Sequence, residues 1–481
     1  MKILIYLLFI LTMVTSASAQ LPNSNMHLLS NLNLHPVPAQ FSAPWDYAAI
    51  WGYVAPDGKE YAILGGTIGT SFYNISDSAN IYEVDYFPTT VNTANPDQGV
   101  LWKEMKVYSH YAYVVSEADT SGIEIYDLQY LPDTVVFVKK YTPPGHRTTH
   151  TISQEGPYLY LNGCNSAFGQ GVAVLDLSAD PENPVLRGKW NTRYVHDCRV
   201  LRDTIYAMNI YDGNVTVIDA RNKDSLKTIS QWLNSPNPSP HNSAISSDRG
   251  FLFATDEVGA LPRLLKVWNI EDLSSVTQVA TWQPTNITTS IVHNVEIYGD
   301  TAVIAHYTAG VRVLDVSNPA VPVEIGWYDT YPTSNGNSYL GCWGVYKFPS
   351  GKIAASDMKT GLFVLQMGKS VGINNNNLNV ADGYSLGQNY PNPFNPNTTI
   401  NYNIPSGLNG KKSDVRLVVS DILGNEIATL VNEKKDPGNY SVNFSATSNG
   451  LNLASGVYFY KLSVTGGISE YTDIKRMILL K

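Results

Sequence analysis

Charged side chains are scarce in this chain of 481 residues, since 15% are Asp, Glu, Lys or Arg, against about 25% in an average soluble protein. No segment is rich in Lys or Arg, and 32 basic residues against 41 acidic ones give a formal net charge of -9. Nucleic acids and anionic membranes attract clustered positive charge. The composition therefore argues against both as partners.

Cysteine is also rare, with Cys164, Cys198 and Cys342 as the three examples. An odd number leaves at least one thiol unpaired, and three residues are too few for the disulfide framework of a small secreted scaffold. A bridge between Cys164 and Cys198 remains an alternative. The favoured interpretation is that all three are small buried side chains in strands.

The one long apolar run lies at the start of the chain. Lys2 is followed by apolar residues from Ile3 to Val14 and then by Ala17-Ser18-Ala19. This pattern predicts a secretory signal peptide over residues 1–19, with cleavage after Ala19. A membrane anchor, the alternative, needs about 20 apolar residues. No later segment approaches that length, so the mature chain is expected to lack a transmembrane segment.

Glycine, proline and tyrosine are plentiful, with 36, 27 and 31 residues. That profile predicts an all-β protein with many short strands and turns. Residues 385–481 alternate apolar and polar positions between Gly, Pro and Asn turns, which predicts a small immunoglobulin-like β-sandwich. Residues 368–384, with Asn374 to Asn377 in a row, lack apolar periodicity and are expected to form a linker.

Several motifs follow one another in this C-terminal region: LGQNYPNPFNP from Leu386, VSDILG from Val419, ASGVYFYK from Ala454 and KRMILLK from Lys475. In this order they resemble the C-terminal sorting domain of proteins exported by the type IX secretion system of Bacteroidetes-like bacteria. The resemblance implies that the chain engages the type IX machinery and crosses the outer membrane. Attachment to the cell surface or release outside the cell would follow.

Residues 20–367 contain a unit that repeats seven times. A Trp or His opens each unit, at intervals of 45 to 52 residues: Trp51, Trp102, His150, His196, His241, His293 and Trp343. About 25 residues later a short apolar run ends in one of a second set: Asn74, Asp127, Asp176, Asp219, Asn269, Asp315 and Gln366. Two landmarks that advance together make a chance match improbable.

Each unit has room for four strands, so the region is expected to be a seven-bladed β-propeller. The seventh unit lacks a fourth strand after Gln366. The segment from Met26 to Leu34 is expected to supply that strand and close the ring. A β-helix or a sandwich is the alternative.

The repeat resembles the LVIVD repeat of bacterial surface propellers, whose pattern is Val-x-Val-x-Asp followed by Ser-x-Pro-x-x-Pro. Residues 311–322 carry this pattern well, whereas Asn74, Asn269 and Gln366 stand where Asp is expected. The whole region also looks like exported propellers of the choice-of-anchor type, which have no well-defined activity. The resemblance implies a fold and a surface location and says little about chemistry.

One mouth of the channel should collect polar side chains, because the start of a blade's first strand lies beside the end of its second. The expected ligand-binding mouth consists of Trp51, Trp102, Glu117, His150, His196, His241, His293, His306, Trp343 and Asp357. The structural alternative is that these groups bind channel water and hold the blades in register.

Imidazole and carboxylate groups together suit a divalent metal. The expected metal ligands are His196, His241 and His293, with Asp256 or Glu257 as a fourth ligand or as general base for a bound water. No HExxH, GxSxG or Walker-type motif supports an enzyme.

The sequence therefore favours a secreted, surface-displayed propeller that binds an extracellular protein or glycan at this mouth without catalysis. A metal-dependent hydrolase or lyase using the same His and carboxylate groups is the alternative.

Overall fold

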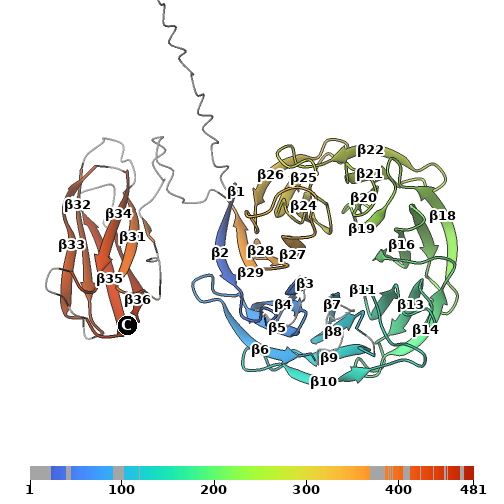
Figure 1. Ribbon diagram of the computed structural model, residues 1–481, viewed down its shortest axis with the longest axis horizontal. Coiled ribbons are helices and arrows are strands. Elements are labelled where there is room, and N and C mark those ends of the chain that lie inside the picture. Colours follow the sequence, from blue (N-terminus) through green and yellow to red (C-terminus); the bar gives the residue numbers. More distant parts are fainter. Residues whose placement is uncertain are drawn as a thin grey trace, which may run out of the picture. The chain divides into compact units, whose positions relative to one another are not determined.

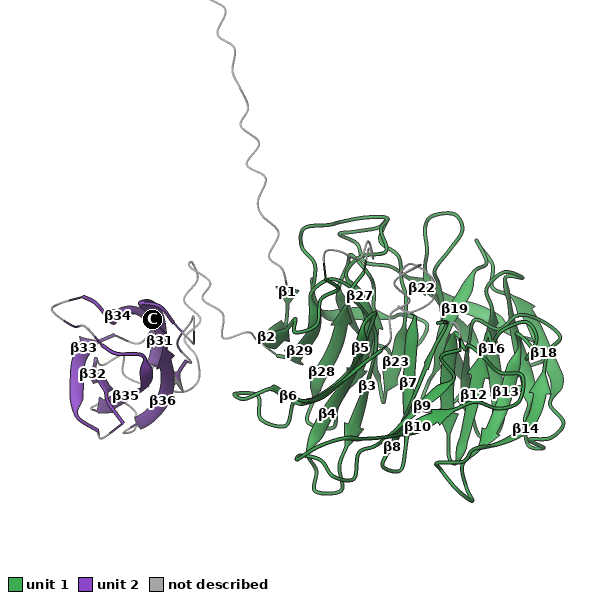
Figure 2. Cartoon of the chain, turned by 60° about the horizontal axis from the view of Figure 1, so that its bottom comes forward, with its two compact units in different colours: residues 1–370 green, residues 371–481 purple. Residues whose placement is uncertain are grey.

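The computed structural model consists of two compact units, one within residues 1–370 and one within residues 371–481 (Figure 2). It is all-β, with no helix among the residues described. The predicted signal peptide and nearly all of the predicted linker lie outside those residues. The structure describes residues 23–38, 45–89, 102–118, 120–368, and 385–480 apart from gaps at 388, 390–391, 393, 405–411, 423, 437, 449–450, 452 and 466–470.

The first unit is a seven-bladed β-propeller, as the repeat predicted (Figure 1). Blade 1 contains β3 (Tyr47–Val54), β4 (Glu60–Gly66), β5 (Gly69–Asn74) and β6 (Tyr82–Pro88). Blade 2 contains β7 (Lys103–Tyr108), β8 (Tyr111–Ser116), β9 (Ile123–Asp127) and β10 (Val136–Tyr141). Blade 3 contains β11 (Thr151–Glu155), β12 (Tyr158–Asn162), β13 (Val172–Asp176) and β14 (Val185–Trp190). Blade 4 contains β15 (Asp197–Leu201), β16 (Thr204–Asn209), β17 (Asn214–Asp219) and β18 (Lys227–Leu233). Blade 5 contains β19 (Pro240–Ile245), β20 (Phe251–Asp256), β21 (Leu265–Asn269) and β22 (Thr277–Trp282).

Blade 6 contains β23 (Val295–Tyr298), β24 (Thr301–Ala305), β25 (Val311–Asp315) and β26 (Val323–Tyr328). Blade 7 contains β27 (Cys342–Lys347), β28 (Lys352–Asp357) and β29 (Gly361–Met367). The ring closes through β2 (Met26–Leu32), which pairs antiparallel with β29 from Met26 opposite Met367 to Leu32 opposite Leu362. Figure 1 shows the blue β2 beside the orange β29. The predicted closing strand is therefore present. An additional strand, β1 (Asn23–Ser24), extends blade 6 and was not expected.

Burial differs between the strands of a blade and accounts for the low charge of the chain. Every residue of β4 and of β28 is buried, because neighbouring blades cover both faces of these middle strands. Outer strands such as β18 alternate between exposed and partly buried residues. Cys164, Cys198 and Cys342 are all buried and free, so no disulfide joins Cys164 to Cys198.

The closing residue of the repeat forms a local turn at the end of the third strand. The Asp315 Oδ1 atom accepts a hydrogen bond from the Ser317 backbone N–H at 2.9 Å, and the Asn269 Oδ1 atom accepts one from Glu271 N–H at 3.0 Å. An Asn side-chain oxygen serves this turn as well as an Asp oxygen does. Gln366 makes no such turn, because it lies within β29 opposite His27 of β2.

The second unit is a small two-sheet sandwich, as expected. One sheet contains β30 (Ser385–Leu386), β31 (Asn397–Ile404) and β34 (Gly438–Ser445); the other contains β33 (Glu426–Lys435), β32 (Ser413–Ser420), β35 (Gly456–Thr465) and β36 (Tyr471–Leu479). Ile400 of the first sheet and Leu417 and Leu462 of the second belong to one fully buried apolar cluster.

Candidate functional site

Six aromatic side chains from six blades lie in continuous contact at the channel. In order of contact, this aromatic arc comprises Trp102, Trp343, His293, His241, His196 and His150, with successive ring centroids 4.1 to 4.8 Å apart. Each residue lies at or next to the start of its blade's first strand, which is why the repeat brings them together. Four of the seven residues that open the repeats are histidines, and their imidazoles thus lie in one row.

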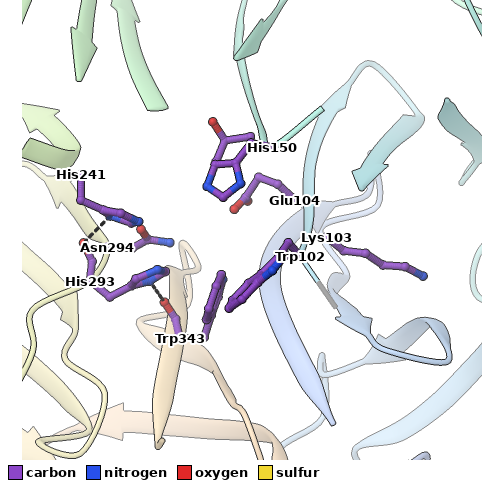
Figure 3. A pocket seen from close by; sticks show the side chains of 9 residues that line it. Trp102, Lys103, Glu104, His150, His241, His293, Asn294 and Trp343 are labelled. Atoms are coloured by element: carbon purple, nitrogen blue, oxygen red, sulfur yellow. Dashed lines mark hydrogen bonds between the residues drawn. The ribbon is translucent and has the colours of Figure 1, made fainter. Parts of the chain in front are cut away.

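The space enclosed by the arc is small. Figure 3 shows the imidazoles of His150, His241 and His293 and the indole of Trp102 around a shared hollow, with Lys103 directed away from it. The volume of this hollow is about 10 Å³, which is room for about one water molecule or one ion.

Backbone carbonyls determine the tautomers of two imidazoles. The Nδ1 atom of His293 lies 2.5 Å from the Trp343 carbonyl oxygen, and the Nδ1 atom of His241 lies 3.3 Å from the His293 carbonyl oxygen. Because a carbonyl oxygen only accepts, each Nδ1 must carry the hydrogen. In the neutral ring, the lone pair is therefore on Nε2.

Both Nε2 atoms face the carboxylate of Glu257. Glu257 Oε2 lies 3.5 Å from His241 Nε2, and Glu257 Oε1 lies 3.6 Å from His293 Nε2. Tyr307 donates its hydroxyl hydrogen to Glu257 Oε1 at 2.7 Å, and its ring contacts His293. The lone pairs of two imidazoles thus converge on one anionic group.

The far end of the arc has a different hydrogen-bond pattern. His150 Nδ1 lies 2.7 Å from Glu117 Oε1, and His150 Nε2 lies 2.8 Å from His196 Nε2. Burial acts against the charged form of His150, but the hydrogen bond and charge of Glu117 raise its pKa above the usual value. Glu117 and His150 therefore contact each other as the sequence placed them.

The other three imidazoles of the arc are kept neutral. Burial lowers the pKa of His241 and holds the pKa of His196 and His293 well below the usual value. The adjacent imidazoles of the arc reinforce the effect, because a positive charge on one disfavours a charge on the next. Neutral imidazoles offer lone pairs at neutral pH.

Asp256 does not reach the arc. Its Oδ2 atom is 2.7 Å from Lys266 Nζ, and its Oδ1 atom accepts hydrogen bonds from Asn234 Nδ2 at 2.8 Å and Ser239 N–H at 3.1 Å. Adjacent residues of an extended chain point to opposite sides, so Glu257 faces the imidazoles while Asp256 faces the interior of blade 5. Asp256 is thus engaged in an ion pair rather than available as a ligand.

Three further predicted mouth residues also lie away from the arc. His306 Nδ1 is 3.1 Å from Ser290 Oγ, and it is the next residue, Tyr307, that reaches the arc. Asp357 accepts hydrogen bonds from Thr330 and from the turn that follows it. Trp51 contacts Tyr346 rather than the arc. The register of β3 shifts between Tyr47 and Ile50. Trp102 and Trp343 meet directly.

Sequence reasoning missed a layer of charged and polar side chains that lines the channel next to the arc. Arg199 bonds Glu296 at 2.8 Å, Asn242 bonds Asp197 at 2.5 Å, and Lys106 lies 3.4 Å from Glu104. Charged residues at alternate positions of the first strands, such as Glu104 and Lys106, were the available signal. The layer consists of charged and polar side chains that bond to one another within the channel.

Within the described residues, His196, His241 and Glu257 offer ligand atoms that all lie within 4.8 Å of one another. Small movements of these side chains would bring the three ligand atoms to the separation found around one metal ion. Of the two predicted carboxylates, Glu257 lies with these imidazoles, and His293 faces the same carboxylate.

No helix among the described residues has the length and apolar character needed to cross a membrane.

Comparison with known proteins identifies one repeat. The model of the LVIVD repeat matches residues 291–330, a segment that includes β24, β25 and β26 of blade 6. No curated protein matches the chain. Among solved structures, a similar chain is PorZ, described as an essential bacterial surface component of the type IX secretion system of Porphyromonas gingivalis, with a TM-score of 0.43 and 12% identity over 89% of this chain. This chain spans about 59% of the length of PorZ. The chain thus contains an LVIVD repeat in a seven-bladed propeller.

Proposed function

We propose that this chain is an exported propeller, displayed at the cell surface, that binds an extracellular ligand over the aromatic arc. The observation that carries the proposal is the gathering of six aromatic side chains from six blades at one place on the channel. Such convergence of rings and polar groups from several elements is typical of a recognition site.

Aromatic side chains beside the arc supply contact surface for a ligand. Tyr211 is 77% exposed and packs on Tyr194, which in turn contacts His196. Trp45 packs on Trp102 and donates its indole N–H to the Tyr339 carbonyl oxygen at 2.8 Å. Partly exposed aromatic rings with polar edges suit a glycan or a protein surface. Trp343 is buried and belongs to the packing.

The size of the hollow favours binding over catalysis. A hydrolase or lyase needs a substrate atom beside its catalytic groups, and the 10 Å³ hollow of the arc has room for about one water or ion. A larger ligand would lie over the arc, against the rings of Tyr211, Tyr194 and Tyr339.

The ligand test uses the mature chain on a panel of immobilised polysaccharides and on intact cells. We expect Tyr211→Ala to weaken binding about tenfold or more, the loss of one stacking contact of about 1.4 kcal/mol. Tyr130→Ala is the matched control, because Tyr130 is similarly exposed, at 51%, in the turn after β9. Equal binding by both variants would contradict a site at this mouth.

We also propose that the C-terminal sandwich directs export through the type IX system. The ordered motifs from Leu386 to Lys475 support this assignment. Deleting residues 385–481 should trap the propeller in the periplasm, where immunoblotting of cell fractions would detect it. Normal surface display of the truncated chain would refute the assignment without touching the proposed ligand site.

A further inference from the structure

We propose that the arc binds one zinc-type divalent metal ion through His196, His241 and Glu257, with His293 facing the same carboxylate. The inference is independent of ligand recognition at the mouth and of export. It starts from two contacts that are unfavourable by themselves. His241 and His293 direct the lone pairs of their Nε2 atoms toward the two oxygens of Glu257.

Two lone-pair donors facing an anion repel each other unless positive charge lies between them. The Nε2 atom of His293 is buried and has no hydrogen-bond partner among the described residues. A divalent cation bound by His241 and Glu257 would turn the first contact into coordinate bonds and would neutralise the charge that His293 faces. The geometry therefore points to a cation as the group that completes this arrangement.

The distances between the donor atoms suit such an ion. Zinc ligands at about 2.0–2.1 Å in a tetrahedron lie roughly 3.3 Å from one another. The separations from Glu257 to His241 and His293 are 3.5 and 3.6 Å. Small side-chain rotations would bring both pairs to that value. One ring nitrogen of His196 lies within 4.8 Å of ligand atoms of His241 and Glu257. The Nδ1 atom of His196 is buried and has no hydrogen-bond partner among the described residues.

Groups behind the donors already hold them in position. The Trp343 carbonyl fixes the ring of His293, the His293 carbonyl fixes the ring of His241, and the Tyr307 hydroxyl fixes Glu257. Such outer hydrogen bonds set the tautomer and orientation of metal-binding imidazoles.

The charge and the ligand types select the class of ion. Imidazole nitrogens with one carboxylate suit zinc, and also manganese, iron and cobalt, better than calcium or magnesium, which prefer oxygen ligands alone. His196, His241 and Glu257 form one such group of donors among the described residues. We therefore expect one metal ion for each chain.

The test is a zinc titration of the mature chain after treatment with a chelator. Plasma mass spectrometry should find about one zinc per chain, and calorimetry should give a single class of sites. Co²⁺ in place of zinc should give the intense visible absorption of a tetrahedral imidazole site. Binding below about 0.3 equivalents of zinc, after reconstitution, would overturn the proposal.

Glu257→Gln is the key variant because it keeps the shape of the side chain and removes its charge. We expect it to weaken zinc binding at least about 100-fold. His306→Asn is the matched control, since His306 is a buried imidazole outside the arc. The zinc affinity of this variant should stay within about threefold of wild type. Zinc bound equally by wild type and Glu257→Gln would place the ion elsewhere and overturn the assignment. His241→Asn provides a second test of the same prediction if Glu257→Gln fails to fold.

Discussion

The Oε2 atom of Glu257 lies 3.5 Å from the Nε2 atom of His241, and both atoms carry lone pairs when the imidazole is neutral. Glu257→Gln should therefore stabilise the metal-free chain, by about 1 kcal/mol, because an amide N–H can donate to His241 where a carboxylate oxygen cannot. Saturating zinc should reverse the order, since wild type gains the free energy of binding the ion.

Urea unfolding of both chains, with chelator and with zinc, measures this reversal. Tryptophan fluorescence reports on the propeller alone, because all nine tryptophans precede residue 344. A Glu257→Gln chain that is less stable than wild type without metal would mean that a proton already bridges the two residues.

A buried imidazole outside the arc makes the propeller sensitive to acid. Burial, reinforced by the charge of Arg312, lowers the pKa of His306 to about 3. The unfolded chain takes up this proton near pH 6.5 and the folded chain does not, so the stabilising contribution is complete above pH 6.5 and is lost as pH falls toward 3. Between pH 7 and pH 5 the loss is about 2 kcal/mol.

His306→Asn should remove that part of the pH dependence. The unfolding free energy of the variant should fall by about 2 kcal/mol less than that of wild type between pH 7 and pH 5. Urea unfolding at each pH gives the two slopes. Parallel slopes would show that His306 is protonated in the folded chain over this range.

The propeller was predictable from sequence because two landmarks mark each blade. The Asp and Asn landmark recurs since it forms the turn after the third strand, as at Asp315. The row of imidazoles was predictable for the same reason, because each occupies an equivalent place in its blade. The choice between Asp256 and Glu257 was not predictable from sequence, because it depends on the direction of the side chain just beyond the end of β20. Trp51 lies outside the arc because it is the fifth residue of β3, whereas the arc residues lie at or next to the starts of their strands.

The ion pair between Asp256 and Lys266 provides a separate test of whether Asp256 is a metal ligand. Lys266 is fully buried, so Lys266→Met leaves an uncompensated carboxylate in blade 5 and should cost about 3–5 kcal/mol. Adding Asp256→Asn should recover most of the loss, since the charge disappears and Asn234 and Ser239 still bond the side chain. Zinc binding by the double variant should match that of wild type. A loss of zinc together with intact folding would restore Asp256 as a ligand.

Gly310 enters the third strand of blade 6 at a position that only glycine fits. Its φ is +74°, and a Cβ atom there would lie 2.1 Å from the Tyr328 carbonyl oxygen. Gly310→Ala should cost about 3 kcal/mol or more, because both backbone strain and a steric clash act on it. Gly299→Ala is the matched control, with φ of +62° and nothing within 4 Å of the added carbon, and should cost about 1 kcal/mol. Equal losses of unfolding free energy would mean that the clash is relieved by movement of β26.

Removal of β2 should open the ring of blades. A chain that begins at residue 35 lacks the strand that pairs with β29 and lacks Met26, which is fully buried. Loss of that side chain alone should cost about 2–3 kcal/mol, and the bare edge of β29 should promote association with other chains. A chain that begins at residue 25 is the control, because among the described residues it loses only the two of β1, and it should change by less than about 0.5 kcal/mol. Tryptophan fluorescence and size-exclusion chromatography compare the two. Equal stability of both truncated chains would show that blade 7 holds its place with three strands, and that pairing between the two ends of the propeller contributes little to its closure.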